Sequence, residues 1–197
     1  VNQEKDVKTT IYEVPVDLGR EGMDDSLVRH LNIGHTKSGD FSDWEDLRRR
    51  YAEPEGEIEI AVVGKYIKLH DAYKSIYEAL GHGAVEHSWK VKYRKISAEE
   101  CYNNDPAVLL DGVHGVVVPG GFGERGLEGK IRAIQWAREN DIPCFGICFG
   151  MQAMTIEFAR NVAGIEGANT SAVYPDRAAP VIDLIQEQES VGDEGGT

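Results

Sequence analysis

The sequence predicts an α/β fold with a mainly parallel sheet flanked by helices. Two observations carry this prediction. Short apolar segments typical of strands alternate with amphipathic segments typical of helices from residue 57 onward, which is the pattern of parallel strands joined by right-handed crossovers. Glycine-rich or cysteine-bearing turns follow several of the strands, and sites in such sheets form at the carboxyl ends of strands.

Residues 1–56 differ from the rest because they carry no pattern that would form a core of their own. The elements expected there are a short strand over 11–15, a helix over 20–31, a polar loop over 34–42, a charged helix over 43–52 and a breaker over 53–56. We therefore expect two parts. Residues 1–56 would be the end of another domain plus a linker, and residues 57–197 would be the α/β domain.

The second part alternates strands and helices in order. Strands are expected over 58–63, 89–96, 113–118, 143–147 and 181–185, and helices over 71–80, 127–138 and 149–162. Asp71 is the expected N-cap of the first helix, and Ser97 with Glu100 has the form of a capping box before a short helix. The acidic, glycine-rich residues 186–197 predict a loop or a frayed tail.

Composition narrows the function classes. The formal net charge of -13 argues against nonspecific nucleic-acid binding through the overall field. No apolar run approaches ~18 residues, so we expect no membrane span. Three cysteines do not make a disulfide framework, which fits a reducing, cytoplasmic setting. None of the six histidines has a zinc-type Cys/His spacing, so we expect no metal site.

The stretch from Gly146 to Gly150 has the form of a nucleophile elbow around Cys148. Two glycines flank the cysteine between a strand and a helix, so the backbone can make a tight turn that holds the sulfur clear. The positive end of the helix favours thiolate over thiol, and the N–H of Phe149 would point toward an oxyanion. The alternative is a buried structural cysteine beside two packing glycines.

The glycine-rich turn over residues 119–123 lacks the spacing and the Lys-Ser/Thr of a phosphate-binding loop, so it predicts a backbone N–H donor near the nucleophile or a simple turn. Gln152, one helical turn beyond Cys148, either reaches a substrate or lies on the surface. The two lysines and two tyrosines in 64–66 and 71–75 either bind a ligand, form a domain interface or are simply exposed on the surface. No histidine has a context that marks it as the base for Cys148.

Several linked motifs resemble the glutamine amidotransferase domain of the CTP synthase family. They are Pro-Gly-Gly-Phe-Gly-x-Arg-Gly-x-Glu-Gly-Lys (119–130), Gly-Ile-Cys-Phe-Gly-Met-Gln (146–152), Glu-Phe-Ala-Arg-Asn-Val (157–162), Val-Gly-Lys-Tyr (63–66) and Asp-Ala-Tyr-Lys-Ser (71–75). Residues 11–15 and 21–25 look like the end of the family's synthetase domain and its linker. The resemblance covers nearly the whole chain and implies a flavodoxin-like class I amidotransferase fold.

The resemblance also implies a function. The family is a glutamine-hydrolysing ligase that makes CTP from UTP, with ATP and Mg in its synthetase domain and GTP as activator, and the complete enzyme is typically a homotetramer. Carried over, Cys148 would form a glutamyl thioester with glutamine. The N–H groups of Gly121 and Phe149 would form the oxyanion hole, and Gly120, Phe122 and Gln152 would line the glutamine pocket. No cofactor, nucleic-acid or membrane contact is expected within this chain.

The sequence departs from the family pattern in three places. The family's catalytic His and Glu, and an arginine for the glutamine carboxylate, come after the point that matches Thr197, so we expect an incomplete domain with impaired turnover. Ala172 stands where the family has the glutamate that holds the substrate amino group, and Phe149 where it usually has leucine. The rival hypothesis is a noncatalytic regulatory or binding module that kept the fold. A different cysteine hydrolase is disfavoured by the linker motifs.

Overall fold

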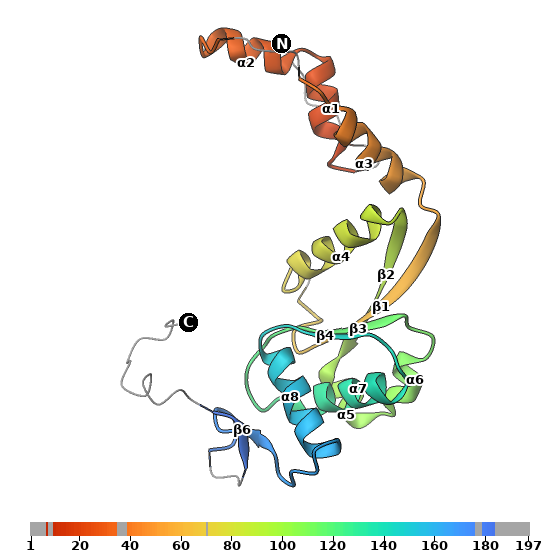
Figure 1. Cartoon of the computed structure of the whole chain (residues 1–197), viewed down its shortest axis with the longest axis vertical. Coiled ribbons are helices and arrows are strands. Elements are labelled where there is room, and N and C mark those ends of the chain that lie inside the picture. The colour runs from red at the N-terminus through yellow and green to blue at the C-terminus, as the bar shows by residue number, and fades with distance from the viewer. Residues whose placement is uncertain (1–6, 8–9, 35–38, 70, 176–178, 184–197) are drawn as a thin grey trace. The chain divides into compact units, whose positions relative to one another are not determined.

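A computed structural model describes residues 7, 10–34, 39–69, 71–175 and 179–183 (Figure 1). The chain divides into two compact units. The first contains residues 1–57 and 78–91, and the second contains residues 58–77 and 92–197. The division after residue 57 lies one residue from the expected boundary, whereas residues 78–91 group with the first unit.

The first unit contains the helices α1 (Glu13–Arg20), α2 (Met23–His30) and α3 (Ser42–Ala52). The predicted strand over 11–15 is wrong, because α1 begins at Glu13. Pro15 lies in the first turn of that helix, where a missing N–H leaves no hydrogen bond unmade. Gly22, with φ of 74°, separates α1 from α2. The helices expected over 20–31 and 43–52 are confirmed as α2 and α3.

A four-stranded sheet in the order β2-β1-β3-β4 organises the second unit. Its strands are β1 (Gly56–Gly64), β2 (Trp89–Ser97), β3 (Gly115–Val118) and β4 (Cys144–Gly146). β3 pairs in parallel with β1, with Val62 opposite Val117, and in parallel with β4, with Val118 opposite Gly146. The predicted parallel sheet is therefore confirmed, and β3 and β4 end side by side.

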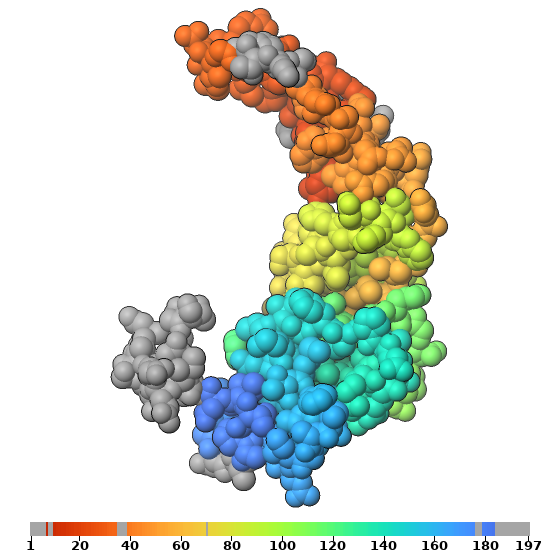
Figure 2. Space-filling model, in the orientation of Figure 1, coloured from red at the N-terminus to blue at the C-terminus, as the bar shows by residue number. Residues whose placement is uncertain are grey.

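Burial explains why these segments form strands and helices. All four residues of β3 are buried, as expected for an apolar strand in a parallel sheet that is covered on both faces. α7 (Leu127–Glu139) and α8 (Phe149–Asn161) bury one face each against this core and match the predicted helices within one residue at each end. Figure 2 shows the elements from β3 onward, green through blue, packed against one another.

Short elements follow local capping signals. α5 (Ala98–Asn103) begins with the predicted capping box, in which Ser97 Oγ accepts from the Glu99 N–H at 3.3 Å and Glu100 accepts from the Ser97 N–H at 2.8 Å. α6 (Pro106–Leu110) was not predicted, although Asp105 caps it through the Ala107 N–H at 3.0 Å and Pro106 opens it. The sequence signal for α6 was therefore present.

Two boundaries differ from the prediction. α4 (Lys74–Glu86) starts three residues later than expected and extends six residues further, and Asp71 lies in the preceding turn rather than at the N-cap. Its carbonyl accepts from the Lys74 N–H at 3.2 Å. The strand expected over 181–185 is β6 (Pro180–Ile182), paired with the unpredicted β5 (Asn169–Thr170). Residues 35–38 of the predicted loop, residues 184–185 and the predicted tail over 186–197 lie outside the described residues.

Over the ranges that the structure describes, no helix has both the length and the apolar character needed to cross a membrane.

Candidate active site

Cys148 lies on a strained turn between β4 and α8. Its φ and ψ are 54° and -115°, and α8 begins at the next residue. A Cβ added to Gly150 would lie 1.8 Å from the carbonyl oxygen of Val118, and one added to Gly146 would lie 2.6 Å from the Gly150 backbone. Only glycine fits at both positions, and the turn has the predicted form of a nucleophile elbow. Cys148 is exposed rather than buried, unlike the structural cysteine of the alternative interpretation.

The glycine-rich loop after β3 lies against this turn. The Ile147 N–H donates to the Val118 carbonyl at 3.0 Å, so the ends of β3 and β4 lie side by side. A Cβ placed on Gly120 would lie 3.9 Å from Cys148 Sγ, so the Gly120 backbone borders the sulfur. Gly121 has a φ of 112°, which favours glycine. The structure therefore brings this loop and the cysteine together, as the sequence predicts.

The other expected binding residues surround the same turn. The Phe122 and Phe149 rings lie 5.0 Å apart between centroids, with Phe122 exposed and Phe149 fully buried. Phe149 contributes its ring to this contact, while its N–H stays at the first position of α8. Gln152 is half-buried one turn along α8, and its N–H donates to the Cys148 carbonyl at 3.2 Å.

Sequence reasoning missed the lysine that supports the loop from behind. Lys130, on α7, is 1% exposed, and its Nζ donates to the carbonyl oxygens of Pro119 at 2.9 Å and Gly120 at 3.1 Å. Nothing in the helical pattern marked this lysine as buried. Lys65, which the sequence left open between ligand, interface and surface, donates to the Phe122 carbonyl at 2.6 Å.

Burial raises the pKa of two of the three cysteines and lowers the pKa of Lys130. Desolvation raises the pKa of Cys101 to about 12, with Glu100 adding to it, and raises the pKa of Cys144 to about 11, with a smaller effect from Glu157. Desolvation also lowers the pKa of Lys130 to about 8, helped by the charge of Lys65 and opposed by Cys148. Cys101 and Cys144 are therefore poor nucleophiles at neutral pH, because both stay protonated.

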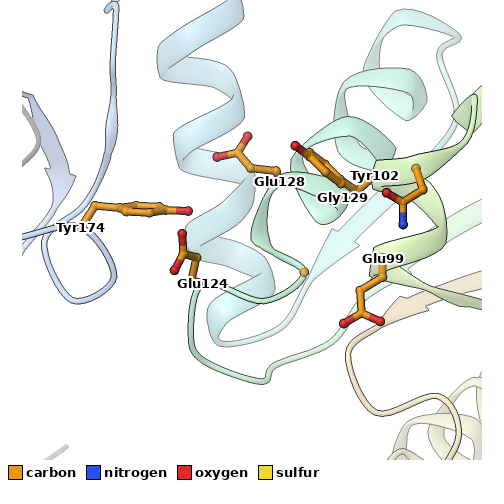
Figure 3. A pocket seen from close by; sticks show the side chains of 8 residues that line it. Glu99, Tyr102, Glu124, Glu128, Gly129 and Tyr174 are labelled. Carbon is orange, nitrogen blue, oxygen red and sulfur yellow. The ribbon is translucent and has the colours of Figure 1, made fainter.

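A cavity of about 360 Å³ lies elsewhere in the second unit (Figure 3). Its lining residues are Glu99, Tyr102, Asn103, Glu124, Gly126, Glu128, Gly129 and Tyr174, which include none of the predicted site residues. Arginines pair with two of its three carboxylates: Arg160 lies 2.8 Å from Glu128 and Arg125 lies 3.1 Å from Glu99. These pairs hold neighbouring elements together, and Cys148 is not among the residues that line the cavity.

Ala172, at the position of the expected family glutamate, is exposed in the turn after β5. Its neighbour Val173 packs against the core, so the turn is anchored without help from the alanine side chain. One histidine has a structural role: His114 Nδ1 accepts from the Glu59 N–H at 3.1 Å. Among the residues that the structure describes, no three His, Cys, Asp or Glu side chains converge as metal ligands.

Comparison with known proteins places this geometry in a family. Residues 68–195 match the model of "Glutamine amidotransferase class-I". The chain is 51% identical over 188 residues to a CTP synthase of Desulfitobacterium hafniense, 47% over 197 residues to one of Caldanaerobacter subterraneus, and 48% over 192 residues to one of Pyrococcus furiosus. These matches cover 95%, 100% and 98% of the chain, but only 35%, 36% and 35% of the relatives. The chain thus spans about a third of the length of the curated relatives it matches.

A solved structure is also similar. It is described as the glutaminase domain of Trypanosoma brucei CTPS with bound acivicin, and it is 34% identical to this chain with a TM-score of 0.62. The match covers 68% of this chain and 52% of that one.

Proposed function

Because this chain belongs to the class-I glutamine amidotransferase family, we propose that it is the glutaminase part of a CTP synthase, and that Cys148 is its nucleophile. One observation carries the assignment of Cys148: an exposed sulfur on a strained glycine-flanked turn, bordered by the Gly120 backbone at the carboxyl ends of two parallel strands. The similarity to CTP synthases over nearly the whole chain supports the choice of enzyme.

The proposed reaction begins with attack of Cys148 Sγ on the side-chain amide carbon of glutamine. The sulfur–carbon bond forms as the carbonyl electron pair moves to oxygen, and the N–H groups of Gly121 and Phe149 donate to that oxyanion. The oxyanion then re-forms the carbonyl as the carbon–nitrogen bond breaks, and the nitrogen takes up the proton that Cys148 lost on forming the thiolate and leaves as ammonia. Water hydrolyses the remaining thioester, which gives glutamate and the free thiol.

The rest of the proposed enzyme would use that ammonia. In a CTP synthase the synthetase domain would use ATP and Mg to activate UTP, ammonia would complete the amination to CTP, and GTP would activate the glutaminase. These roles, the homotetramer and the cytoplasmic setting are proposals that rest on the resemblance. Phe122 and Gln152 are proposed to line the glutamine pocket, because both lie next to the elbow.

We expect the 197 residues alone to turn over glutamine slowly. Protonation of the departing nitrogen requires a general acid, and the residues that match the family pattern here do not include its catalytic His and Glu. Glutamine hydrolysis by the 197-residue chain at the rate of a complete CTP synthase would contradict this expectation.

Covalent labelling tests the proposed nucleophile. The chain would be treated at about pH 7.5 with a glutamine-analogue electrophile such as acivicin, with and without glutamine, and the adducts mapped by intact mass and peptide mass spectrometry. We expect a single adduct at Cys148 that glutamine prevents, because the pKa values of about 12 and 11 keep Cys101 and Cys144 protonated. Cys148→Ser should abolish the adduct, and the matched control Cys144→Ser should not. An unlabelled Cys148 would refute the proposal.

The rival function is a noncatalytic module that kept the fold, and Ala172 is the observation that favours it. The same labelling separates the two: a module would give no glutamine-protected adduct at Cys148. The native gene gives a second, inexpensive discriminator. A reading frame that continues into a segment bearing the family's His and Glu supports the enzyme, whereas a stop codon directly after Thr197 supports the module.

A further inference from the structure

Two ammonium groups hold four consecutive backbone carbonyls of the loop after β3. Lys130 Nζ lies 2.9, 3.1 and 3.4 Å from the carbonyl oxygens of residues 119–121. Lys65 Nζ lies 2.6 Å from the carbonyl oxygen of Phe122, the next residue. Lys130 lies on α7 and Lys65 follows β1, so lysines from two different parts of the fold hydrogen-bond to one short loop.

These hydrogen bonds fix the direction of the N–H groups of the loop. In a planar trans peptide, the carbonyl of one residue and the N–H of the next point in opposite directions. Carbonyls turned toward the lysines therefore turn the N–H groups of residues 120–123 away from them. A Cβ added to Gly120 would lie 3.9 Å from Cys148 Sγ, so the N–H groups turned away from the lysines belong to a stretch of backbone that borders the sulfur.

Lys130 is buried beneath the loop and does not lie on the surface. It is 1% exposed, and its Nζ lies 5.2 Å from the centroid of the Phe149 ring, which directly follows Cys148. A buried ammonium is costly unless its three N–H groups are hydrogen-bonded, and the three carbonyls of residues 119–121 supply those partners. Burial also lowers the pKa of Lys130, so desolvation opposes the charge at this position even with the carbonyl partners in place.

We propose that Lys130, assisted by Lys65, is a positioning residue: it locks the peptide planes of residues 119–122 so that the Gly121 N–H faces the oxyanion formed when Cys148 attacks. This inference rests on the proposed glutaminase function. It adds that the oxyanion hole is held in its donating orientation by a buried ammonium behind the loop. Lys130 itself touches neither the substrate nor the sulfur in this role.

An aldehyde analogue of glutamine, glutamate γ-semialdehyde, tests this role because it mimics the tetrahedral intermediate. Cys148 Sγ bonds to the aldehyde carbon, the carbonyl electron pair moves to oxygen, and that oxygen takes up the proton that the thiol gives up, so the addition has no leaving group. The hemithioacetal blocks alkylation, so its stability is read as the aldehyde concentration that halves the rate of Cys148 modification by iodoacetamide. Glutamine protection, measured in the same way, reports ground-state binding. Both are measured on the chain as its gene encodes it.

Lys130→Met keeps the length and apolar stem of the side chain but removes the donors. We expect the protecting concentration of the aldehyde to rise about tenfold or more, while that of glutamine changes less than about threefold, because only the tetrahedral adduct places its oxygen in the oxyanion hole, where the Gly121 N–H would donate to it. The matched control is Lys92→Met on β2, whose side chain is 61% exposed and whose Nζ lies 4.0 Å from Glu59. It removes the same charge and should change neither value.

Lys65→Met provides an independent test if the first variant does not fold, since Lys65 is only half-buried and holds one carbonyl. We expect the same selective loss of aldehyde protection, but a smaller one. Equal losses for aldehyde and glutamine, or no loss in a folded variant, would overturn the positioning role. If the unmodified protein is protected by neither compound, the proposed function itself fails.

Discussion

At the scale of the residue, Lys130 shows how a single charge links the glycine-rich loop after β3 to the stability of the fold. Its ammonium is almost fully buried and bonded to backbone carbonyls. Such a group stabilises the loop only while the hydrogen bonds offset its loss of hydration. The charge therefore has a measurable effect on folding as well as on the proposed chemistry.

The first prediction concerns the pH dependence of that effect. The pKa of Lys130 falls from an ordinary 10.5 to about 8 on folding, mainly through burial. Between those values the unfolded chain binds a proton that the folded chain does not, so this residue makes the free energy of unfolding rise with pH across the window. Below about pH 8 both states are protonated and the full burial penalty applies.

Urea unfolding of the unmodified protein and of Lys130→Met at about pH 7.5, 9 and 10.5 measures this contribution. The difference in unfolding free energy between the two proteins should shift in favour of the unmodified one by up to about 3 kcal/mol over the series. Other groups that titrate at alkaline pH, such as Tyr73 and Cys101, are present in both proteins and cancel. A difference that stays constant with pH would show that the lysine titrates normally.

The second residue-scale prediction concerns Ala172. Its side chain is exposed, so Ala172→Glu should fold with a change in unfolding free energy within about 0.5 kcal/mol. If the chain binds glutamine as proposed, the new carboxylate should pair with the substrate amino group and lower the glutamine concentration that protects Cys148 by about tenfold. Ala172→Gln, which has the same shape without the charge, is the control. Equal protection in all three proteins would contradict the assigned position.

At the scale of the element, close helix packing is set by single glycines. A Cβ on Gly129 of α7 would lie 1.7 Å from the carbonyl oxygen of Ala98, which opens α5. These two helices can approach only because residue 129 has no side chain. Their contact also carries the capping box of α5 and places Lys130, the next residue, beneath the loop.

Gly129→Ala should therefore destabilise the protein by about 1–3 kcal/mol or more, since the backbone of α5 must move to relieve the overlap. The matched control is Gly83→Ala in α4, where an added Cβ meets nothing within 4 Å. That change should stabilise by about 0.5–1 kcal/mol through helix propensity. Thermal and urea unfolding measure both. Similar effects from the two alanines would contradict the packing that the structure shows.

Elements with strong periodicity could be predicted from the sequence, and weakly patterned ones could not. β3 is a run of valines and α7 has a clear apolar stripe, so both were expected within two residues at each end. The sequence predicts a strand in place of α1 because residues 11–15 combine β-favouring side chains with a proline, although a proline is equally compatible with the first turn of a helix. Two-residue β5 is too short to leave a pattern.

The site was predictable where local geometry dictates residue type. The roles of the glycines around Cys148 and after β3 could be predicted because the backbone there approaches other atoms too closely for a Cβ. The burial of Lys130 could not be predicted, since a lysine in the first turn of a helix has the same sequence pattern whether it faces solvent or three carbonyls. Its role follows only from the way the sheet brings α7 beneath the loop.

At the scale of the whole molecule, the sequence carries a net charge of -13 over 197 residues. Self-repulsion of that size opposes the compact state at low ionic strength. Ion pairs do not offset it fully, because pairs such as Arg20–Glu45 and Arg125–Glu99 have both side chains exposed and such pairs contribute about 0–1 kcal/mol each.

Salt should consequently stabilise the fold. Raising NaCl from about 0.01 M to 1 M shortens the screening length from about 30 Å to about 3 Å, and the midpoint of thermal unfolding should rise by several degrees. KCl at equal ionic strength is the control and should act alike, because screening does not depend on the cation. A midpoint that falls with added salt would mean that ion pairs outweigh the net repulsion.

The backbone angles of Cys148 also bear on the history of the protein. A non-glycine residue held at φ of 54° costs about 1–3 kcal/mol, and one base change converts a cysteine codon to glycine. In a lineage that no longer needed the sulfur, drift would meet that stabilising substitution early and keep it. The strain therefore gives a cysteine at this position no advantage in stability, and its presence there fits the nucleophilic role proposed for it.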